Sequence, residues 1–322
     1  MAEQQHRLLE PIADAPIPTW FRIGGRADRL VNVRTTDELA AAVTSDPGCR
    51  LLGDGANLLV DDDGVGELVV ATKSMNRVEV DAASGRVVAD AGADLAKLIL
   101  TTVRAGLGGI EGLAGIPATL GGAVIMNAGG AFGQIADAVR AITAIDRGGG
   151  LRRIERSDIG FGYRRSGLAP AIVVTIELQL TPGDAVALRA ALKDVMAYKS
   201  KSQPMAADSA GCCFKNPTLL SDLADEKGDL GPAGKRVSAG MLIDRAGLKG
   251  LAIGGASVSP IHANFLVTKL GATARDVIYL MREIERRVHD RFGVVLEREV
   301  VVWERDPGRA ESTSRRDLHH AD

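Results

Sequence analysis

The chain has 322 residues, which at about 150 residues per domain predicts two or three domains. Hydrophobic residues make up 46% of it and charged residues 25%, a mixture typical of folded globular proteins that excludes wholesale disorder. Because 39 Lys and Arg oppose 41 Asp and Glu, the net charge of −2 provides no global positive field for nucleic acid or anionic lipid.

The first predicted unit is a small α/β lobe. Thr35 and Glu38 form a capping box that opens an alanine-rich helix over residues 37–44. The tight turn Gly53–Asn57 separates two short apolar runs and lies at the edge of the lobe. The predicted strands are residues 29–34, 49–52 and 58–60.

The second predicted unit is an α+β domain over about residues 66–182, closed by a helix. Asp94 caps one helix of this domain, and a further helix runs from Asp184 to about Lys199. The stretch Gly112–Gly130 is expected to be one long loop that is too apolar to be disordered. The predicted strands are residues 68–72, 78–81, 86–89, 138–146, 151–155 and 171–180.

The third segment starts near Gln203 and contains the most regular helix, Thr273–Phe292, which Gly293 ends. Residues 294–296 and 300–303 predict strands on either side of a charged triplet. The expected domains are a first lobe (1–65), a second lobe (66–200), a third domain (201–304, of which strand 294–304 can return to the first lobe) and a polar tail (305–322).

Three cysteines, Cys49, Cys212 and Cys213, cannot form a disulfide framework, and a reducing compartment fits them best. No apolar run of the signal-peptide kind opens the chain, so we expect a cytoplasmic location. The longest uncharged stretch, residues 112–136, contains seven glycines and a proline, which argues against a membrane span. Adjacent cysteines without a second cysteine pair do not match zinc spacing, so no metal is expected.

The two glycine-rich stretches are candidates for a phosphate site. In Gly53–Asn57 and Gly112–Gly130, glycines let successive backbone N–H groups turn inward and form a concavity that holds a diphosphate. Glycine content alone favours two ordinary structural loops. Neither stretch is a P-loop, and Glu111 stands where a dinucleotide fingerprint has its third glycine.

Other polar clusters each have a structural alternative. The pair Tyr163–Arg164 suits an anionic substrate group or forms a charged surface turn. Cys212 is a proton donor, a nucleophile or an inert buried thiol. Glu297 and Glu299 share one face of a predicted strand, either as a buried acidic site or as plain surface. For His262, a satisfied structural histidine is favoured.

In their order along the chain, eight motifs resemble those of the UDP-N-acetylenolpyruvoylglucosamine reductases of bacterial peptidoglycan synthesis, over about residues 15–303. The motifs are Thr19–Gly25, Leu52–Leu59, Gly115–Gly122 with Asn127–Gly129, Tyr163–Arg164, Ala210–Pro217, Ala239–Gly250, His262–Phe265 and Leu296–Val300. The resemblance implies an α+β fold in which a two-lobed FAD-binding domain of the vanillyl-alcohol-oxidase (PCMH) type precedes a C-terminal α+β substrate-binding domain.

The resemblance also implies one bound FAD, whose pyrophosphate lies between the two glycine turns. Ala56 stands where serine is usual in the family, which removes one side-chain hydrogen bond, worth about 1 kcal/mol. The implied cofactor-binding residues are Gly53, Asp54, Gly55, Ala56, Asn57, Leu58, Gly115, Ile116, Pro117, Thr119, Gly121, Gly122 and Asn127.

The implied reaction is the NADPH-dependent reduction of UDP-N-acetylglucosamine enolpyruvate to UDP-N-acetylmuramate through the flavin. Arg164 matches the family's cation beside the reacting carboxylate, and Glu299 matches a nearby carboxylate. Cys212 stands where many members have serine as proton donor, and a thiol is a stronger acid than an alcohol. The implied substrate-binding residues are Tyr163, Lys215, Asn216, His262 and Asn264.

Two alternatives stay open from the sequence: an FAD-dependent alcohol or sugar oxidase of the same superfamily, and a non-catalytic nucleotide-sugar binder. About seven residues separate Arg164 from the next predicted strand, which indicates the shorter subtype without a substrate-covering loop. Lys199 and Lys201 are either diphosphate contacts or a solvated helix end. We expect a monomer whose partners are the substrate and NADPH, with no nucleic acid and no membrane.

Overall fold

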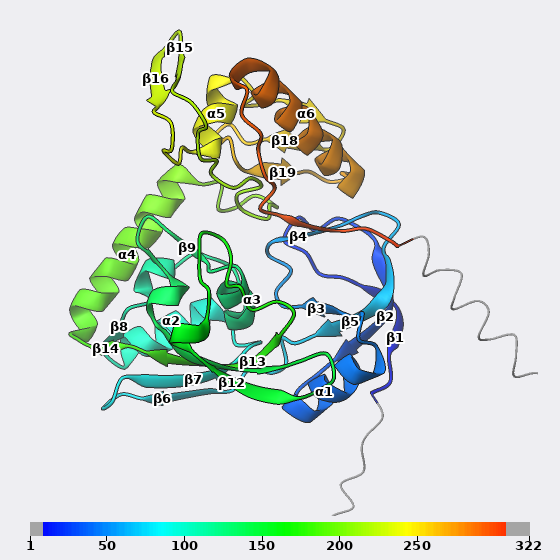
Figure 1. Cartoon of the computed structure of the whole chain (residues 1–322), viewed down its shortest axis with the longest axis vertical. Coiled ribbons are helices and arrows are strands. Elements are labelled where there is room, and N and C mark those ends of the chain that lie inside the picture. Colours follow the sequence, from blue (N-terminus) through cyan, green and yellow to red (C-terminus); the bar gives the residue numbers. More distant parts are fainter. Residues whose placement is uncertain (1–8, 307–322) are drawn as a thin grey trace, which may run out of the picture.

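The computed structural model describes residues 9–306. Two lobes lie side by side, and a third domain lies across one end of both (Figure 1). Helix α4 (Ala185–Ser202) runs along the outer edge of the second lobe and leads into the third domain. Among residues 9–306, no helix is both long enough and apolar enough to cross a membrane.

The first lobe is built on a sheet with the strand order β1-β2-β5-β3, in which only β1 runs antiparallel to its neighbour. The elements are β1 (Ile12–Pro16), β2 (Arg26–Asn32), α1 (Thr36–Ser45), β3 (Arg50–Leu52) and β5 (Val65–Ala71). Because β5 is an inner strand of this sheet, we propose that the first lobe extends to Ala71 and not only to residue 65.

Helix α1 begins where the sequence predicts. The Thr35 hydroxyl accepts a hydrogen bond from the Glu38 N–H at 3.2 Å, as a capping residue does. The Glu38 carboxylate, however, accepts from the N–H of Arg34 at 2.6 Å, one residue before the cap. The two side chains therefore still satisfy two free N–H groups at the start of the helix.

The end of the described chain returns to the first lobe. Strand β20 (Val301–Trp303) pairs in parallel with β4 (Leu58–Val60), which directly follows the first glycine turn. The Asn57 side chain donates to the Glu299 carbonyl at 2.9 Å. Residues 297–299 are thereby anchored beside that turn. Residues 294–296 form no strand, contrary to the sequence prediction, because they pair with no neighbouring strand.

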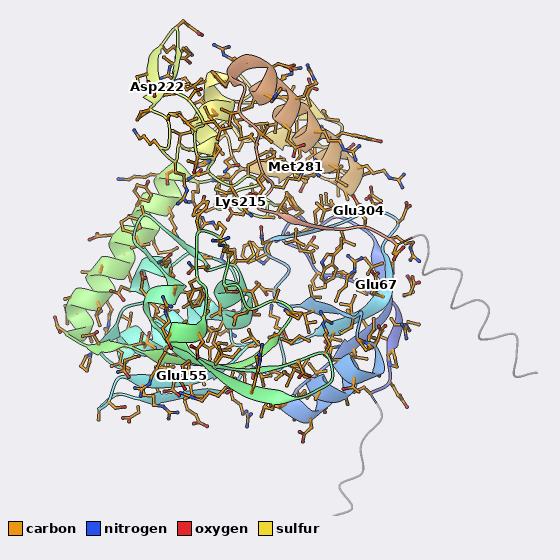
Figure 2. The ribbon with its side chains drawn as sticks, in the orientation of Figure 1. Glu67, Glu155, Lys215, Asp222, Met281 and Glu304 are labelled. Atoms are coloured by element: carbon orange, nitrogen blue, oxygen red, sulfur yellow. The ribbon has the colours of Figure 1, made fainter. Side chains whose placement is uncertain are left out.

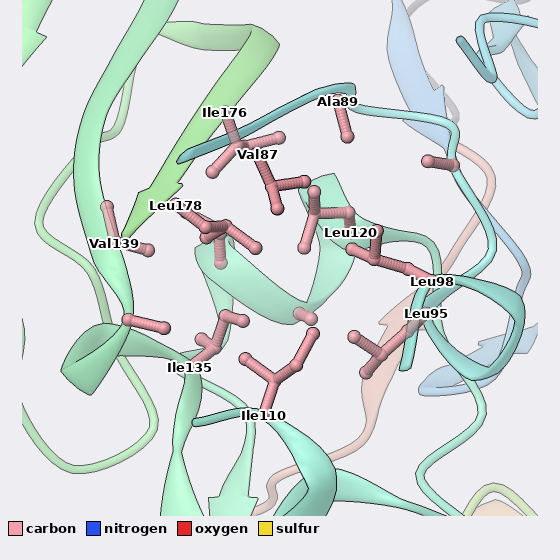
Figure 3. Close-up of a cluster of buried hydrophobic side chains, with 14 of the residues drawn as sticks. Val87, Ala89, Leu95, Leu98, Ile110, Leu120, Ile135, Val139, Ile176 and Leu178 are labelled. Atoms are coloured by element: carbon pink, nitrogen blue, oxygen red, sulfur yellow. The ribbon is translucent and has the colours of Figure 1, made fainter. Parts of the chain in front are cut away.

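The second lobe is an antiparallel sheet, with the order β12-β11-β13-β7-β6, that helices cover. Leu98 of α2 (Leu95–Arg104) and Leu120 of α3 (Leu120–Ile125) lie in one buried cluster with Val87 and Ile176 of the sheet (Figure 3). Full burial of each such side chain contributes about 1.5–3 kcal/mol to folding. The elements are β6 (Val78–Asp81), β7 (Arg86–Asp90), α2 (Leu95–Arg104), β8 (Leu107–Gly108), β11 (Val139–Ile145), β12 (Leu151–Glu155), β13 (Ile172–Gln179), β14 (Thr181–Pro182) and the 3₁₀ turns Ile135–Asp137 and Arg156–Asp158.

The expectation that Gly112–Gly130 is one loop is wrong. The stretch contains the end of the 3₁₀ turn Glu111–Leu113, helix α3 (Leu120–Ile125) and β9 (Gly129–Gly130), which pairs with β10 (Gly133–Gln134). Helix α3 forms despite its glycines because Thr119 caps it, accepting from the Gly122 N–H at 3.3 Å. The Gly121 N–H also donates to the Ala91 carbonyl at 2.8 Å, which holds the helix start against the sheet.

The third domain packs two helices against small sheets. Helix α6 starts at the Thr273 cap and ends at Gly293, whose φ of 66° is left-handed, as the sequence predicts. Met281 of α6 points into the core of this domain (Figure 2). The elements are β15 (Leu223–Asp225), β16 (Gly228–Gly231), α5 (Ala239–Arg245), β17 (Ala252–Ile253), β18 (Ala256–Val258), β19 (Leu266–Thr268) and α6 (Ala274–Phe292).

Candidate active site

The two glycine turns, Gly53–Asn57 (the first turn) and Gly115–Gly122 (the second turn), lie against each other. A Cβ atom built on Gly53 would lie 2.5 Å from the Thr119 hydroxyl oxygen, so the backbone of the first turn lies against the cap of α3. Gly55 has a φ of +65°, and a side chain there would overlap the Pro18 carbonyl. Glycine is therefore required at both positions, at Gly53 for close approach and at Gly55 for backbone conformation as well.

The first turn presents unused hydrogen-bond donors. Within residues 9–306, no backbone N–H of residues 53–57 donates a hydrogen bond to the protein. In the second turn the N–H groups of Gly115 and Thr119 are likewise unused within this part of the chain, whereas those of Gly121 and Gly122 are occupied. Clustered free N–H groups form the kind of concavity that holds a phosphate. The donor set therefore fits the pyrophosphate of an FAD.

Charge near the first turn is already balanced. Asp54 forms an ion pair with Lys73, and its other oxygen accepts from the Trp20 indole N–H at 2.9 Å. These contacts neutralise the only carboxylate in the turn and leave the backbone donors to an anion. The Asp54 side chain thus holds the turn, and its backbone N–H stays among the unused donors.

Asn127 has a structural role in this arrangement. Its backbone is left-handed (φ +42°), and its side chain donates to the Gly162 carbonyl at 3.0 Å and accepts from the Ala136 N–H at 3.2 Å. Because Gly162 precedes Tyr163 and Arg164, Asn127 connects the second glycine turn to the segment that carries the candidate cation.

Arg164 lies at the junction of the lobes and the third domain. Its φ of +54° is left-handed, and its Nη1 donates to the Gly129 carbonyl at 2.8 Å. Its Nε lies 2.5 Å from a carboxylate oxygen of Glu299, with which it forms an ion pair. The Nε therefore faces the Glu299 carboxylate, and Nη1 faces the Gly129 carbonyl.

Glu299 and Cys212 share this junction. The Glu299 N–H donates to the Cys213 carbonyl at 2.8 Å, which ties the two segments together. Burial raises the pKa of Glu299, and the Arg164 guanidinium opposes that rise. Burial also raises the pKa of Cys212 to about 12, Glu299 adds to the rise, and Arg164 opposes it. Cys212 is thus a protonated thiol at neutral pH, as a proton donor must be.

The raised pKa of Cys212 predicts its reactivity. A shift from 9.0 to about 12 lowers the thiolate fraction roughly 1000-fold at pH 8. In a Cys49→Ala/Cys213→Ala background, we expect iodoacetamide to alkylate Cys212 slowly, with a rate that keeps rising about tenfold per pH unit up to pH 10. Mass spectrometry of quenched samples measures this rate, and the unfolded protein is the control. A rate that levels off near pH 9 would contradict the prediction.

Tyr163 joins the second lobe to the third domain. Its hydroxyl accepts from the Asn216 N–H at 3.0 Å, and two guanidiniums lie near its ring, Arg236 at 4.2 Å and Arg164 at 5.2 Å from the ring centre. Arg236 belongs to no motif that we recognise in the sequence. Only the fold brings it to this ring, where cation–π attraction holds it.

The other predicted substrate-binding residues differ in what they leave free. Lys215 lies where the third domain meets the lobes (Figure 2) and forms an ion pair with Glu297. Asn216 accepts from the Ala239 N–H at 3.0 Å, and no contact within the described chain uses its amide N–H₂ group. Asn264 is buried, and both ends of its amide bond the Phe214 backbone, at 3.0 and 2.8 Å. Asn264 therefore holds the backbone of the site, and its side chain also forms a hydrogen bond with the Cys212 thiol.

The structure distinguishes the alternatives that the sequence left for the pair Glu297 and Glu299 and for His262. The Glu297 side chain is 72% exposed and that of Glu299 only 12%, and each has its own cation, so the two do not form one paired acidic site. The ring of His262 accepts from the Asn264 N–H at 3.2 Å, and burial lowers its pKa. The ring thus has a structural partner, as expected.

Lys199 is buried, so the interpretation of a solvated helix end is wrong for this residue, although Lys201 is exposed. The Lys199 ammonium donates to the Ala114 carbonyl at 2.5 Å, immediately before the glycine turn. Burial lowers the pKa of Lys199 to about 8. Helix α4 is thereby fastened to the second turn.

Among residues 9–306, no three His, Cys, Asp or Glu side chains are grouped as metal ligands would be.

Comparisons with known proteins agree with this geometry. The UDP-N-acetylenolpyruvoylglucosamine reductase C-terminal domain matches residues 203–303, and an FAD binding domain matches residues 27–155. The UDP-N-acetylenolpyruvoylglucosamine reductase of Desulfosudis oleivorans is 40% identical over 88% of this chain and 91% of that protein. Reductase 2 of Symbiobacterium thermophilum is 40% identical over 90% of each. The crystal structure of the Thermus caldophilus reductase superposes with a TM-score of 0.74 at 38% identity, over 92% of this chain and 98% of that one.

Proposed function

The chain belongs to the UDP-N-acetylenolpyruvoylglucosamine reductase family, and from this premise we propose that Arg164, Cys212 and Glu299 carry out its reaction. The protein is an FAD-dependent oxidoreductase that reduces UDP-N-acetylglucosamine enolpyruvate to UDP-N-acetylmuramate with NADPH, in peptidoglycan precursor synthesis. The predicted fold class, an FAD-binding domain followed by a substrate-binding domain, is confirmed. The oxidase and binder alternatives are set aside.

The observation that supports the site proposal best is the convergence of three segments at one junction. Arg164 from the second lobe forms an ion pair with Glu299 of the returning chain, and the Glu299 N–H donates to the carbonyl of Cys213, the neighbour of Cys212 in the third domain. When bound, FAD supplies the hydride chemistry between NADPH and the substrate. The protein's own part is to hold the substrate carboxylate, stabilise the charge that develops there and deliver one proton.

Each residue has a distinct role in that part. The Arg164 guanidinium stabilises negative charge on the substrate carboxylate as it grows in the transition state. The Cys212 thiol gives its proton to the substrate carbon next to the one that receives the hydride. The thiolate that forms lies near the Arg164 cation. Glu299 positions Arg164 through their ion pair. We further propose that Tyr163 and the free Asn216 amide bind the nucleotide sugar.

Smaller features complete the proposal. Only residues 165–171 lie between Arg164 and β13, which supports the shorter subtype. A cytoplasmic location is supported by three free thiols, which a reducing compartment maintains. A monomer is supported by the origin of Arg164, Cys212 and Glu299 in a single chain. We also propose domain boundaries near residues 72 and 203, which the end of β5 and the end of α4 support.

An anaerobic titration tests the proposed function. Addition of NADPH to the FAD-loaded protein is expected to bleach the flavin absorbance near 450 nm, and subsequent addition of UDP-N-acetylglucosamine enolpyruvate is expected to restore it. UDP-N-acetylglucosamine, which lacks the enol ether, is the matched control and leaves the flavin bleached. Recovery of colour only after admission of oxygen would contradict the proposal.

A further inference from the structure

Side chains of α2 and α4 line a groove. Helix α4 lies there on the outside of the second lobe (Figure 1). The volume of the groove is about 460 Å³, within the range of small-molecule sites. The residues that line it are Leu100, Val103 and Arg104 of α2 and Arg189, Leu192 and Lys193 of α4. None of the residues that we assign to the candidate active site lines it.

The charge of this groove is unbalanced. Arg104, Arg189 and Lys193 line it, and none of them has a carboxylate within ion-pair distance among residues 9–306. Most arginines elsewhere in this range are paired, such as Arg153 with Glu155 and Glu177. Asp194 follows Lys193 but does not line the groove. Three unpaired cations around one concavity attract an anion.

The groove also has an apolar lining, so its ligand needs an apolar part in addition to a negative charge. Leu100, Val103 and Leu192 form this lining, and Leu100 is 42% exposed to solvent. Displacement of water from these side chains favours a ligand that carries an apolar chain. The groove therefore suits a molecule with an anionic head and an apolar tail.

The size of the groove decides between a small ligand and a protein partner. Six residues line it, and ten-residue α2 is about 15 Å long. A stable protein–protein interface needs about 800 Å² and 20–30 residues on each side, which exceeds this surface. A concave site also suits an inserted chain better than a flat membrane surface.

We propose that the α2–α4 groove binds a single-chain anionic amphiphile, with its phosphate or carboxylate head between Arg104 and Arg189 and its tail on Leu100, Val103 and Leu192. Arginine forks bond such heads through two parallel N–H groups, and Lys193 adds charge at the rim. The site is separate from the reductase activity and does not depend on the residue roles proposed above.

Calorimetric titration of the FAD-loaded protein with monododecyl phosphate, below its micelle concentration, tests the proposal. We expect saturable one-to-one binding that weakens as salt is added. Inorganic phosphate probes the head alone and dodecyl maltoside the neutral tail, and each is expected to bind at least tenfold more weakly. Equal binding of dodecyl maltoside would overturn the proposal, because the cations would then have no part.

Exposed substitutions separate this groove from other surfaces. The double variant Arg104→Gln/Arg189→Gln is expected to weaken monododecyl phosphate at least tenfold, because two charge-assisted contacts are lost. Arg152→Gln removes an exposed arginine on the edge strand β12 and is the matched control, with unchanged binding. Unchanged affinity in the double variant would overturn the proposal. Displacement of monododecyl phosphate by NADPH would also overturn it, because the amphiphile would then occupy the active site and not the groove. Binding to phosphatidylglycerol vesicles without binding of the monomeric amphiphile would indicate a membrane surface and overturn it equally.

Discussion

Replacement of Cys212 by alanine is expected to slow reduction of the enolpyruvyl substrate by about 10²- to 10⁴-fold, the usual contribution of a general acid. Alanine keeps the backbone bridge to Phe265 but carries no proton. Because the thiol is not needed for hydride transfer from NADPH, the flavin should still bleach at the unaltered rate. Stopped-flow absorbance at 450 nm measures the two half-reactions separately under anaerobic conditions.

Two variants sharpen the test of Cys212. Cys212→Ser restores an O–H donor of similar size, and we expect it to keep turnover within about tenfold of the parent. Cys213→Ala makes the same truncation one residue further on, in a side chain buried in the core of the third domain, and should cost stability rather than substrate reduction. An alanine variant at position 212 that reoxidises the flavin with substrate at the parent rate would remove Cys212 from the mechanism.

Much of the fold could be predicted because its signals are local. The caps Thr35, Asp94, Asp184 and Thr273 each satisfy N–H groups within three residues, so the sequence alone locates four helix starts. Helix α3 escaped prediction because glycine is a poor helix former. Besides the Thr119 cap, α3 is held by the hydrogen bond from the Gly121 N–H to the Ala91 carbonyl, between residues that only the fold brings together.

In the candidate site, too, the sequence predicts the residues that belong to local motifs and misses the contacts between distant residues. Motif order pointed to Arg164, Cys212 and Glu299, and the structure places them at one junction. The sequence leaves Arg236 without a role and Lys199 with two interpretations, because their partners Tyr163 and Ala114 lie 73 and 85 residues away (236 − 163 and 199 − 114). A single sequence carries no signal for contacts of this range, even where one partner, such as Tyr163, belongs to a recognised motif.

Replacement of Gly53 by alanine is expected to weaken FAD binding at least tenfold. The new Cβ would lie 2.5 Å from the Thr119 hydroxyl oxygen, closer than unbonded atoms approach, and threonine is stiff at χ1. Thr119 cannot move away without losing its cap on the Gly122 N–H, so the first turn must shift instead. That shift separates the two sets of free N–H groups that fit one pyrophosphate.

Equilibrium titration of the apoprotein with FAD, followed by flavin fluorescence, measures this effect. Gly130→Ala is the matched control, because its Cβ would have no atom within 4 Å, and its affinity for FAD should not change. Thermal unfolding of the apoprotein distinguishes a loss of FAD binding from a loss of folding stability. The Gly53→Ala variant should lose far more affinity for FAD than free energy of unfolding. If instead the variant binds FAD as the parent does, the two turns do not grip one cofactor together, and the free N–H groups of residues 53–57 serve another purpose.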